Sequence, residues 1–138
     1  MQNMSGGKTA LGLDTGIGVL LCYFGNLACG LPLGLIYSIL VIVQDKTNKV
    51  ARFHAFQALF LMILGIVISI VLLPVYFVAI AVDIAVGFPI LLGLVGLIVL
   101  AISLGLLYFV IMAAIKGYGG EIFKIPVIGD FAEKYANQ

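Results

Sequence analysis

Charged side chains are scarce in this sequence. Only 9% of its 138 residues are Asp, Glu, Lys or Arg, whereas 64% are hydrophobic. A soluble domain carries about 25% charged residues, and a chain this short could not hide so much apolar surface from water. The composition therefore excludes the soluble class and predicts a membrane protein. The net charge of +1 provides no basic field, so we expect no nucleic-acid partner.

Residues that bind metals or perform catalysis are also few. The sequence has one histidine and two cysteines, Cys22 and Cys29. The cysteines are about 10 Å apart along a helix, which is farther than a disulfide reaches, so we expect both to be small packing residues. One histidine cannot build a zinc site. We find no nucleophile–base pair, P-loop or dinucleotide fingerprint, and we predict that the protein is not an enzyme.

Three long apolar stretches dominate the rest of the sequence. Each exceeds the roughly 20 residues that cross a hydrocarbon core, and helix satisfies the backbone inside a bilayer. Pro32 and Pro74 are natural kink sites within two of them. An alternative with four spans would end one at Pro74, but residues 75–82 are too few to cross alone. We therefore predict an all-α, polytopic helical membrane protein with three long transmembrane helices and a short amphipathic C-terminal segment. We predict a single membrane domain over residues 1–138. It consists of an N-terminal arm (1–16), three spans (17–43, 53–82 and 88–115) and a C-terminal tail (116–138).

Basic residues predict the orientation. With three spans, the first loop and the C-terminal tail share one side of the membrane, and they hold six of the seven basic residues: Lys46, Lys49, Arg52, Lys116, Lys124 and Lys134. The positive-inside rule places that side in the cytoplasm. We therefore expect the loop 45–52 and the C-terminus inside and the N-terminus outside.

The polar group at the start of the second stretch is the main candidate site. His54 and Gln57 are three residues apart and share a helix face, and Arg52 precedes them. In one interpretation Arg52 snorkels to phosphates while His54 and Gln57 bond to headgroups or to neighbouring loop backbone. In the other, His54 serves as a proton relay or as an axial ligand of haem or a chlorophyll-type pigment. We predict no cofactor apart from this alternative.

Small residues four apart predict close helix packing, either within the chain or with a partner chain. The pairs are Gly25 with Cys29, Gly30 with Gly34, and Ala101 with Gly105. Asp83 is the only carboxylate in the second stretch, and the nearby Gly87 and Pro89 predict that it is solvated at the outer end of the helix.

The tail has an amphipathic pattern. Pro126 can open a short helix, and Val127, Phe131 and Tyr135 recur every four residues, away from Asp130 and Lys134. This pattern suits a segment lying on the membrane surface. A docking surface for another subunit is the competing interpretation.

Two blocks of the sequence form a recognisable pair. The first contains Arg52, Phe53, His54, Ala55, Gln57 and Ala58, after a Leu31-Pro32 span and a charged loop at residues 45–49. The second is Ile-Pro-x-Ile-Gly at residues 125–129, which includes Gly129. Together they resemble the Tic20-like membrane protein family, which includes the chloroplast inner-envelope translocon component and bacterial relatives. The resemblance implies a component of a protein-conducting assembly. The bacterial relatives lead us to expect a bacterial inner membrane.

Together these features predict a non-enzymatic membrane subunit that packs within a larger complex. Its expected partners are the lipid bilayer and other membrane proteins. The alternative is an accessory subunit of a photosynthetic or respiratory complex that contacts pigment, haem or lipid through His54.

Overall fold

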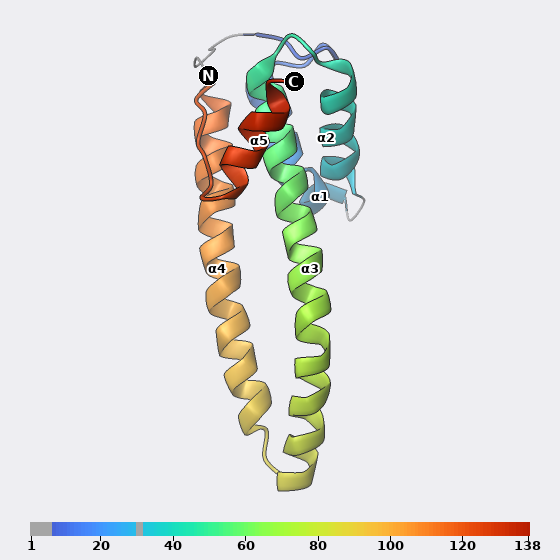
Figure 1. Cartoon of the computed structure of the whole chain (residues 1–138), viewed down its shortest axis with the longest axis vertical. Helices are drawn as coiled ribbons and strands as arrows, with labels where there is room; N and C mark the ends of the chain where they lie inside the picture. The colour runs from blue at the N-terminus through green and yellow to red at the C-terminus, as the bar shows by residue number, and fades with distance from the viewer. Residues whose placement is uncertain (1–6, 30–31) are drawn as a thin grey trace. The chain divides into compact units, whose positions relative to one another are not determined.

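The computed structural model describes residues 7–29 and 32–138. In these ranges the chain is helical and contains no named β-strand, which confirms the all-α class (Figure 1). The contacts divide the chain into two units: unit 1 is Met1–Met62 with Phe109–Gln138, and unit 2 is Ile63–Tyr108. The five described helices are α1 (Thr15–Cys29), α2 (Leu33–Gln44), α3 (Lys49–Val86), α4 (Ile90–Tyr118) and α5 (Ile128–Ala136).

The first apolar stretch is not the single long helix that we predicted across residues 17–43. It forms α1 and α2, which pack on each other within unit 1. They run antiparallel, since the start of α1 is bonded to the loop after α2 and Gly25 near the end of α1 meets Gly34 at the start of α2. Pro32 stands at the N-cap of α2, where a proline ends the preceding helix because its nitrogen cannot donate a hydrogen bond. Gly25 and Gly34 allow the close approach: a Cβ on Gly25 would lie 2.8 Å from the Gly34 nitrogen. We call α1 and α2 together the hairpin.

A set of polar residues joins the two open ends of the hairpin. The Asn48 amide Nδ2 donates to Thr15 Oγ1 at 2.6 Å, and Asp45 Oδ2 accepts from the backbone N–H of Ala10 at 3.0 Å. Asp45 and Asn48 are 1% and 8% exposed. The bond between Asn48 and Thr15 is therefore buried, where a hydrogen bond is strongest, and the bond between Asp45 and Ala10 is partly buried. We call these four residues, Ala10, Thr15, Asp45 and Asn48, the hairpin lock.

The hairpin lock places the described part of the N-terminal arm beside the first loop. Residues 10 and 15 are hydrogen-bonded to residues 45 and 48. Our expectation that these two segments lie on opposite sides of the membrane followed from one continuous helix across residues 17–43, and the structure has two helices there. The orientation of the arm itself stays a prediction.

α3 begins and ends at recognisable signals. Asn48 Oδ1 accepts from Ala51 N at 3.0 Å, which is the contact an N-cap residue makes. The helix continues through Pro74 and ends before Gly87, whose φ of 78° suits glycine. Its bounds are wider than the predicted 53–82.

In unit 2, Asp83 joins α3 to the start of α4. Its two carboxylate oxygens accept from the backbone N–H groups of Leu91 and Leu92 at 2.9 and 2.8 Å. A carboxylate at a helix N-terminus satisfies free N–H groups and complements the helix dipole. Asp83 is only 8% exposed, so the prediction of a solvated surface carboxylate was wrong. α4 spans residues 90–118 instead of the predicted 88–115.

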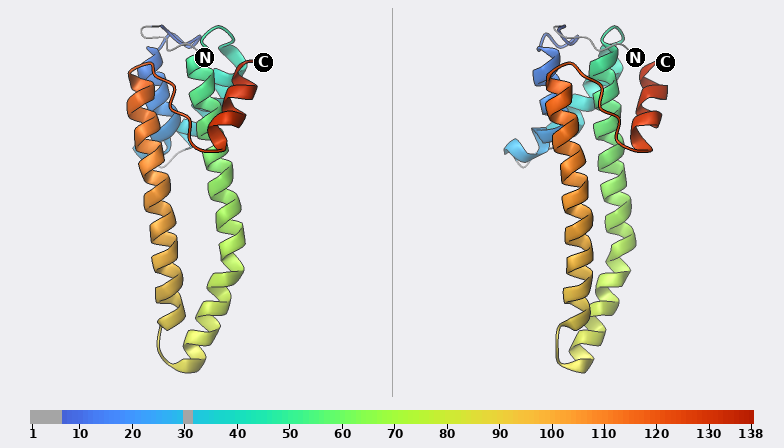
Figure 2. Two further views of the ribbon diagram at one scale, coloured as in Figure 1. Left: turned by 60° about the vertical axis from the view of Figure 1, so that its left-hand side comes forward. Right: turned by 90° about the vertical axis from the view of Figure 1, so that its left-hand side faces the viewer.

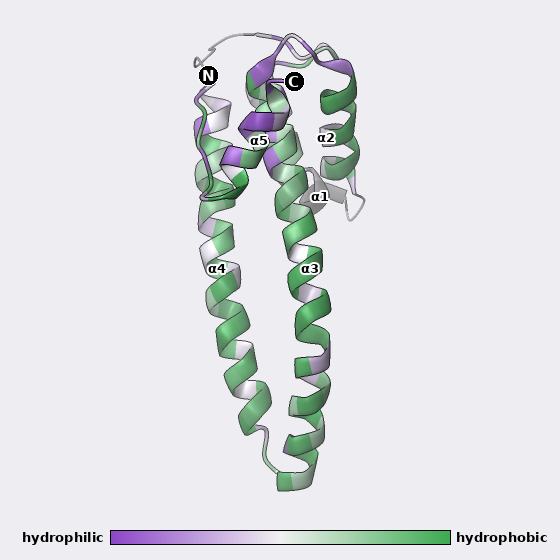
Figure 3. Ribbon diagram, viewed as in Figure 1, coloured by the Kyte–Doolittle hydropathy of each residue, from purple (hydrophilic) through white to green (hydrophobic). Residues whose placement is uncertain are grey.

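Two of the described helices, α3 and α4, are long and apolar enough to cross a membrane. Figure 3 shows both as hydrophobic along most of their length, whereas hydrophilic residues gather in the 45–49 loop and in α5. The most apolar windows of α3 and α4 are 6% and 0% buried within the protein. These surfaces are suited to hydrocarbon.

The tail packs back on unit 1. Figure 2 shows α5 beside the first turns of α3, and Phe53, Ala132 and Ala136 form a buried cluster there. The Tyr135 ring lies 5.9 Å from the rings of Phe56 and of Phe60. The face of α5 that is fully buried is thus its small-residue face, not the Val127–Phe131 edge.

Candidate functional site

Three polar side chains meet in the interior of unit 1. Tyr23 comes from α1, and His54 and Gln57 come from the second and third turns of α3. Their exposed fractions are 8%, 0% and 0%. Buried polar groups must find partners or lose free energy, and the next paragraphs show that these three do. We call them the polar clamp.

His54 uses both ring nitrogens. Nε2 lies 3.1 Å from the carbonyl oxygen of Glu121, and Nδ1 lies 3.1 Å from the Tyr23 hydroxyl. A carbonyl can only accept, so Nε2 carries a proton, and in a neutral ring Nδ1 then accepts from the Tyr23 hydroxyl. The imidazole thus links α1 to the segment after α4.

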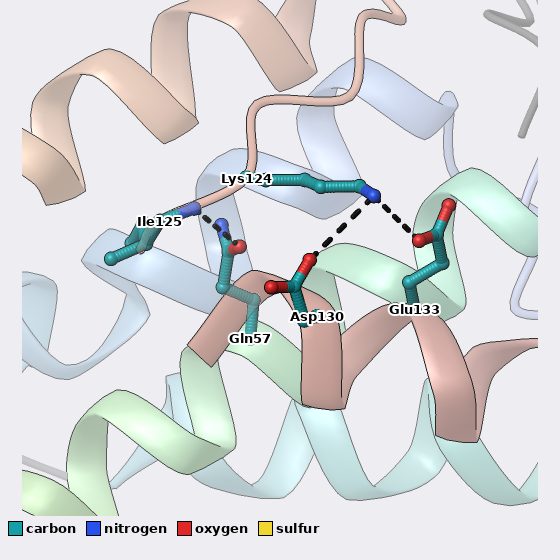
Figure 4. Close-up of polar contacts among 5 residues, drawn as sticks. All are labelled: Gln57, Lys124, Ile125, Asp130 and Glu133. Carbon is teal, nitrogen blue, oxygen red and sulfur yellow. Dashed lines mark hydrogen bonds and ion pairs between the residues drawn. The ribbon is translucent and has the colours of Figure 1, made fainter. Parts of the chain in front are cut away.

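Gln57 completes the set. Its Nε2 donates to the Tyr23 oxygen at 2.9 Å and to the Phe123 carbonyl at 3.1 Å. Its Oε1 accepts from the backbone N–H of Ile125 at 3.2 Å, as Figure 4 shows. Both functional ends of the amide are used. The polar clamp thus holds the backbone of residues 121–125 against α1 and α3.

Tight packing surrounds the imidazole. A Cβ on Gly117 of α4 would lie 2.5 Å from Val19 Cγ1 and 2.8 Å from His54 Nε2. The Phe53 and Tyr23 rings stand edge-on to the imidazole, with centroid distances of 5.2 and 5.9 Å. Only glycine fits at position 117, so the close approach of α4 fixes the ring from one side.

Arg52 binds the end of the tail. Its Nη1 donates to the Ala136 carbonyl at 3.3 Å, and its guanidinium carbon lies 5.9 Å from the centroid of the Phe56 ring. A cation at a helix C-terminus complements the dipole of α5. The Arg52 Nε atom is buried, and the structure gives it no hydrogen-bond partner in the part of the chain it describes.

Lys124 also holds α5, through exposed ion pairs. Its Nζ lies 2.6 Å from Glu133 Oε2 and 3.8 Å from Asp130 Oδ1 (Figure 4). The hydrogen bond from Lys124 lowers the pKa of Glu133 below its usual value, and the same bond raises the pKa of Lys124. Gly129 sits beneath this pair, where a Cβ would lie 2.7 Å from Lys124 Cα.

The strained turn before α5 exposes an apolar side chain. Val127 has a φ of 67°, and the Ile128 N–H donates to the Pro126 carbonyl at 2.8 Å, which closes a three-residue γ-turn. This conformation is rare for a β-branched residue. Pro126 thus opens the helix through a turn, and Val127 and Phe131 are 69% and 54% exposed.

The other predicted residues are divided between contacts and open surface. Lys46 and Lys49 are exposed beside the hairpin lock, and Gly25 meets Gly34 as described above. Gly30 lies outside the described residues, as does the side chain of Cys29. Ala101 is exposed, and a Cβ on Gly105 would meet nothing within 4 Å, so this pair packs on nothing within the described chain.

The polar clamp bears on the two interpretations of His54. Of the predicted partners, the structure has the neighbouring loop backbone, from residues 121 to 125. An axial-ligand role would require one of the two ring bonds to break. Across residues 7–29 and 32–138, no group of three or more His, Cys, Asp or Glu side chains is placed to hold a metal ion.

Several residues of the site carry no signal in the sequence. Tyr23 lies 31 positions before His54, and Thr15 lies 33 positions before Asn48. Glu121 and Phe123 contribute backbone atoms, which no side-chain motif marks. The spacing of Asp45 and Asn48 just before an apolar run was a usable signal for a helix start.

The fold and the site define a small helical membrane protein whose buried polar groups bind its own loops. Residues 13–132 match the magnetosome magnetite crystal formation (MamF/MmsF) protein family, and the chain belongs to that family. Two UPF0132 membrane proteins of Methanocaldococcus jannaschii are similar to it. MJ1443 is 37% identical over 94% of this chain and 96% of its own length, and MJ1527 is 32% identical over 91% and 73%. No solved structure matches.

These matches correct the family resemblance proposed from the two sequence blocks. The chain does not belong to the Tic20-like family, and the protein-conducting role implied by that resemblance is withdrawn. The Arg-Phe-His block misled us because it is short. In the structure its residues serve the polar clamp and the docking of α5, which are needs of local packing.

Proposed function

We propose that this chain is a non-enzymatic integral membrane protein that works by packing its two long helices against other membrane chains. The observation that carries this proposal is that these helices are hardly covered by the rest of the chain: the most apolar windows of α3 and α4 are 6% and 0% buried. Without a hydrophobic force between helices in lipid, association depends on close packing of small residues. α4 exposes Gly93, Gly96, Ala101 and Gly105 for such packing.

The polar residues support a structural rather than a catalytic role. The side chains of the polar clamp form hydrogen bonds with backbone atoms and with one another. Asp45 and Asp83 accept from backbone N–H groups, and Glu121 pairs with Lys116 at 2.8 Å. The family description names magnetite crystal formation. For this chain we propose that any part in such a process is played through the membrane helices rather than through carboxylates offered to a mineral.

A crosslinking experiment tests this proposal. A photoreactive benzophenone amino acid would replace Leu97, which is 65% exposed on α4, and the cells would be irradiated before membrane isolation. We expect discrete protein adducts, identified by mass spectrometry. Position 109 is the matched control, since Phe109 is an aromatic residue packed partly buried against the core of unit 1 and a probe there should react within the chain.

Lipid adducts alone at Leu97 and at the neighbouring exposed positions 100 and 104 would contradict the proposal. An absorbance spectrum of the protein purified in mild detergent examines the pigment or haem alternative on the same sample. A stoichiometric pigment or haem band would favour that alternative and would require His54 to give up a ring bond.

A further inference from the structure

We propose that the hairpin of α1 and α2 inserts into one leaflet of the bilayer and returns to the same surface. The exposed face of α2 would then lie against lipid acyl chains. The inference uses the membrane location of the chain but not its association with partners. It can therefore fail while the proposed function stands, and the reverse also holds.

The first support is that both open ends of the hairpin are at one level. The hairpin lock bonds the start of α1 to the loop after α2 at 2.6 Å and 3.0 Å. The Tyr37 hydroxyl of α2 also lies 3.4 Å from Thr9 Oγ1. A chain that enters and leaves at the same level has not crossed.

Both helices of the hairpin are shorter than a full crossing. α1 has 15 residues and α2 has 12, so at 1.5 Å per residue they are about 22 Å and 18 Å long. A hydrocarbon core is about 30 Å thick, and one leaflet contributes about 15 Å of it. α2 is thus too short to cross and long enough to reach the midplane.

Charge separates the two ends of the hairpin. No Asp, Glu, Lys or Arg occurs from residue 15 to residue 44, which covers α1, α2 and the residues between them. At the open end, Lys8, Lys46 and Lys49 are all exposed. Ammonium groups at that level complement lipid phosphates, and an uncharged turn suits hydrocarbon.

α2 presents two different faces. Gly34, Ser38 and Val41 are buried towards α1, and the Ser38 hydroxyl donates to the Gly34 carbonyl at 2.7 Å, so it offers no polar group outwards. The opposite side is an apolar stripe, with exposures from 37% to 63%, formed by Leu33, Ile36, Ile39, Leu40 and Val43. This stripe is the surface that we assign to acyl chains.

Tryptophan fluorescence measures the depth of the stripe. The chain has no tryptophan, so Leu33→Trp, Val43→Trp and Lys46→Trp each carry a single emitter at an exposed position. Each protein would be reconstituted into phosphatidylcholine vesicles with lipids brominated near the headgroup or near the chain end. We expect chain-end bromines to quench Leu33→Trp most, headgroup-proximal bromines to quench Val43→Trp most, and aqueous iodide to quench Lys46→Trp most.

Thiol labelling measures the side. In a background with Cys22→Ala and Cys29→Ala, Lys8→Cys and Lys46→Cys should react with a membrane-impermeant maleimide from the same side of sealed membrane vesicles. Labelling from opposite sides would overturn the proposal, since α1 and α2 would then cross. Leu33→Trp emission that responds to iodide and not to brominated chains would also overturn it, by placing the stripe in water.

A third pattern identifies a protein cover. If Leu33→Trp is blue-shifted but is quenched by neither bromine label, a partner chain or a second copy covers the stripe and the lipid assignment is wrong. If Leu33→Trp fails to fold, Ile36→Trp repeats the depth measurement, since Ile36 is also exposed, at 49%. A thermal melt in detergent establishes which variants are folded.

Discussion

At the scale of single residues, the polar clamp with a neutral imidazole allows one arrangement of protons. The Glu121 carbonyl fixes the proton on His54 Nε2, which makes Tyr23 the donor to Nδ1 and leaves the Tyr23 oxygen to accept from Gln57. Each group depends on the next, so the three residues act as a unit. A change in any one leaves a buried partner without its bond.

We expect Tyr23→Phe to destabilise the protein by about 1–3 kcal/mol, because it leaves His54 Nδ1 and one Gln57 N–H unpaired in the interior. The measurement is thermal unfolding in mild detergent. Tyr118→Phe is the matched control, since Tyr118 is 60% exposed and should change little. Equal melting temperatures for the Tyr23 variant and the wild type would show that the clamp does not stabilise the fold.

Gly117→Ala tests the close approach of α4 to the imidazole. The added methyl would lie 2.5 Å from Val19 Cγ1, and overpacking of this kind costs about 1–3 kcal/mol. Gly96→Ala is the control on the same helix, since nothing lies within 4 Å of its added Cβ. A glycine-to-alanine change in an open helix is favourable by up to about 1 kcal/mol. The two variants should therefore shift the melting temperature in opposite directions, and a shift in the same direction would contradict the packing around His54.

Part of this site was predictable from the sequence. His54 and Gln57 stand out because they are polar residues in an apolar run, and their common helix face follows from their spacing. Their partners do not stand out. Tyr23 is one of 6 tyrosines, and the carbonyls of residues 121 and 123 are the same as any others until the fold brings them to α3.

At the scale of elements, the apolar stretches predicted where helices form but not how many times the chain crosses. Residues 17–43 satisfy the length rule for a span. That rule counts apolar residues and takes no account of Gly25 and Gly34, which allow α1 and α2 to pack closely as a hairpin. Pro74 has the same residue type as Pro32, yet α3 continues through it. What differs is the tertiary contact: α1 and α2 gain partners by folding back, and the hairpin lock gains its hydrogen bonds.

The docking of α5 should depend on pH. The folded pKa of Glu133 is lowered below its ordinary value of 4.5 by Lys124, so its contribution is complete above that pH and is lost as the pH falls through the folded pKa. The folded pKa of Lys124 is raised above 10.5, so its contribution is complete below that value and is lost as the pH rises through the folded pKa. Docking should therefore be strongest between pH 4.5 and 10.5.

Hydrogen exchange of the α5 amides measures this docking, with rates corrected for the intrinsic effect of pH. Protection should be constant down to pH 4.5 and should decrease as the pH is lowered further, through the folded pKa of Glu133. The decrease should be small, because both groups are largely exposed and screened. Glu133→Gln should remove most of the pH dependence. Asp130→Asn, at the longer distance of 3.8 Å from Lys124, should remove less. An unchanged pH dependence in Glu133→Gln would assign the effect to another group.

At the scale of the whole molecule, the basic residues are confined to one unit. All seven basic residues belong to unit 1, whereas Asp83 is the only charged residue in unit 2. In the arrangement that we propose, the hairpin returns to its starting side, and Lys8 joins the six basic residues of the first loop and the tail. Two crossings by α3 and α4 would then give a stronger positive-inside bias than the three-span arrangement.

This bias predicts that both termini are cytoplasmic. In the background with Cys22→Ala and Cys29→Ala, we expect Phe88→Cys, in the turn after α3, to react with a membrane-impermeant maleimide added to intact cells. Lys46→Cys and Asn137→Cys, both at exposed positions in unit 1, should react only after the membrane is opened. The physical reason is that α3 carries no charged residue between His54 and Asp83, so the whole segment can reside in hydrocarbon, while the basic residues stay on the side where they are synthesised. If Lys46→Cys is labelled in intact cells and Phe88→Cys is protected, the orientation is the reverse of the predicted one, with two crossings kept. If Phe88→Cys and Lys46→Cys are labelled from the same side, α3 does not cross at all.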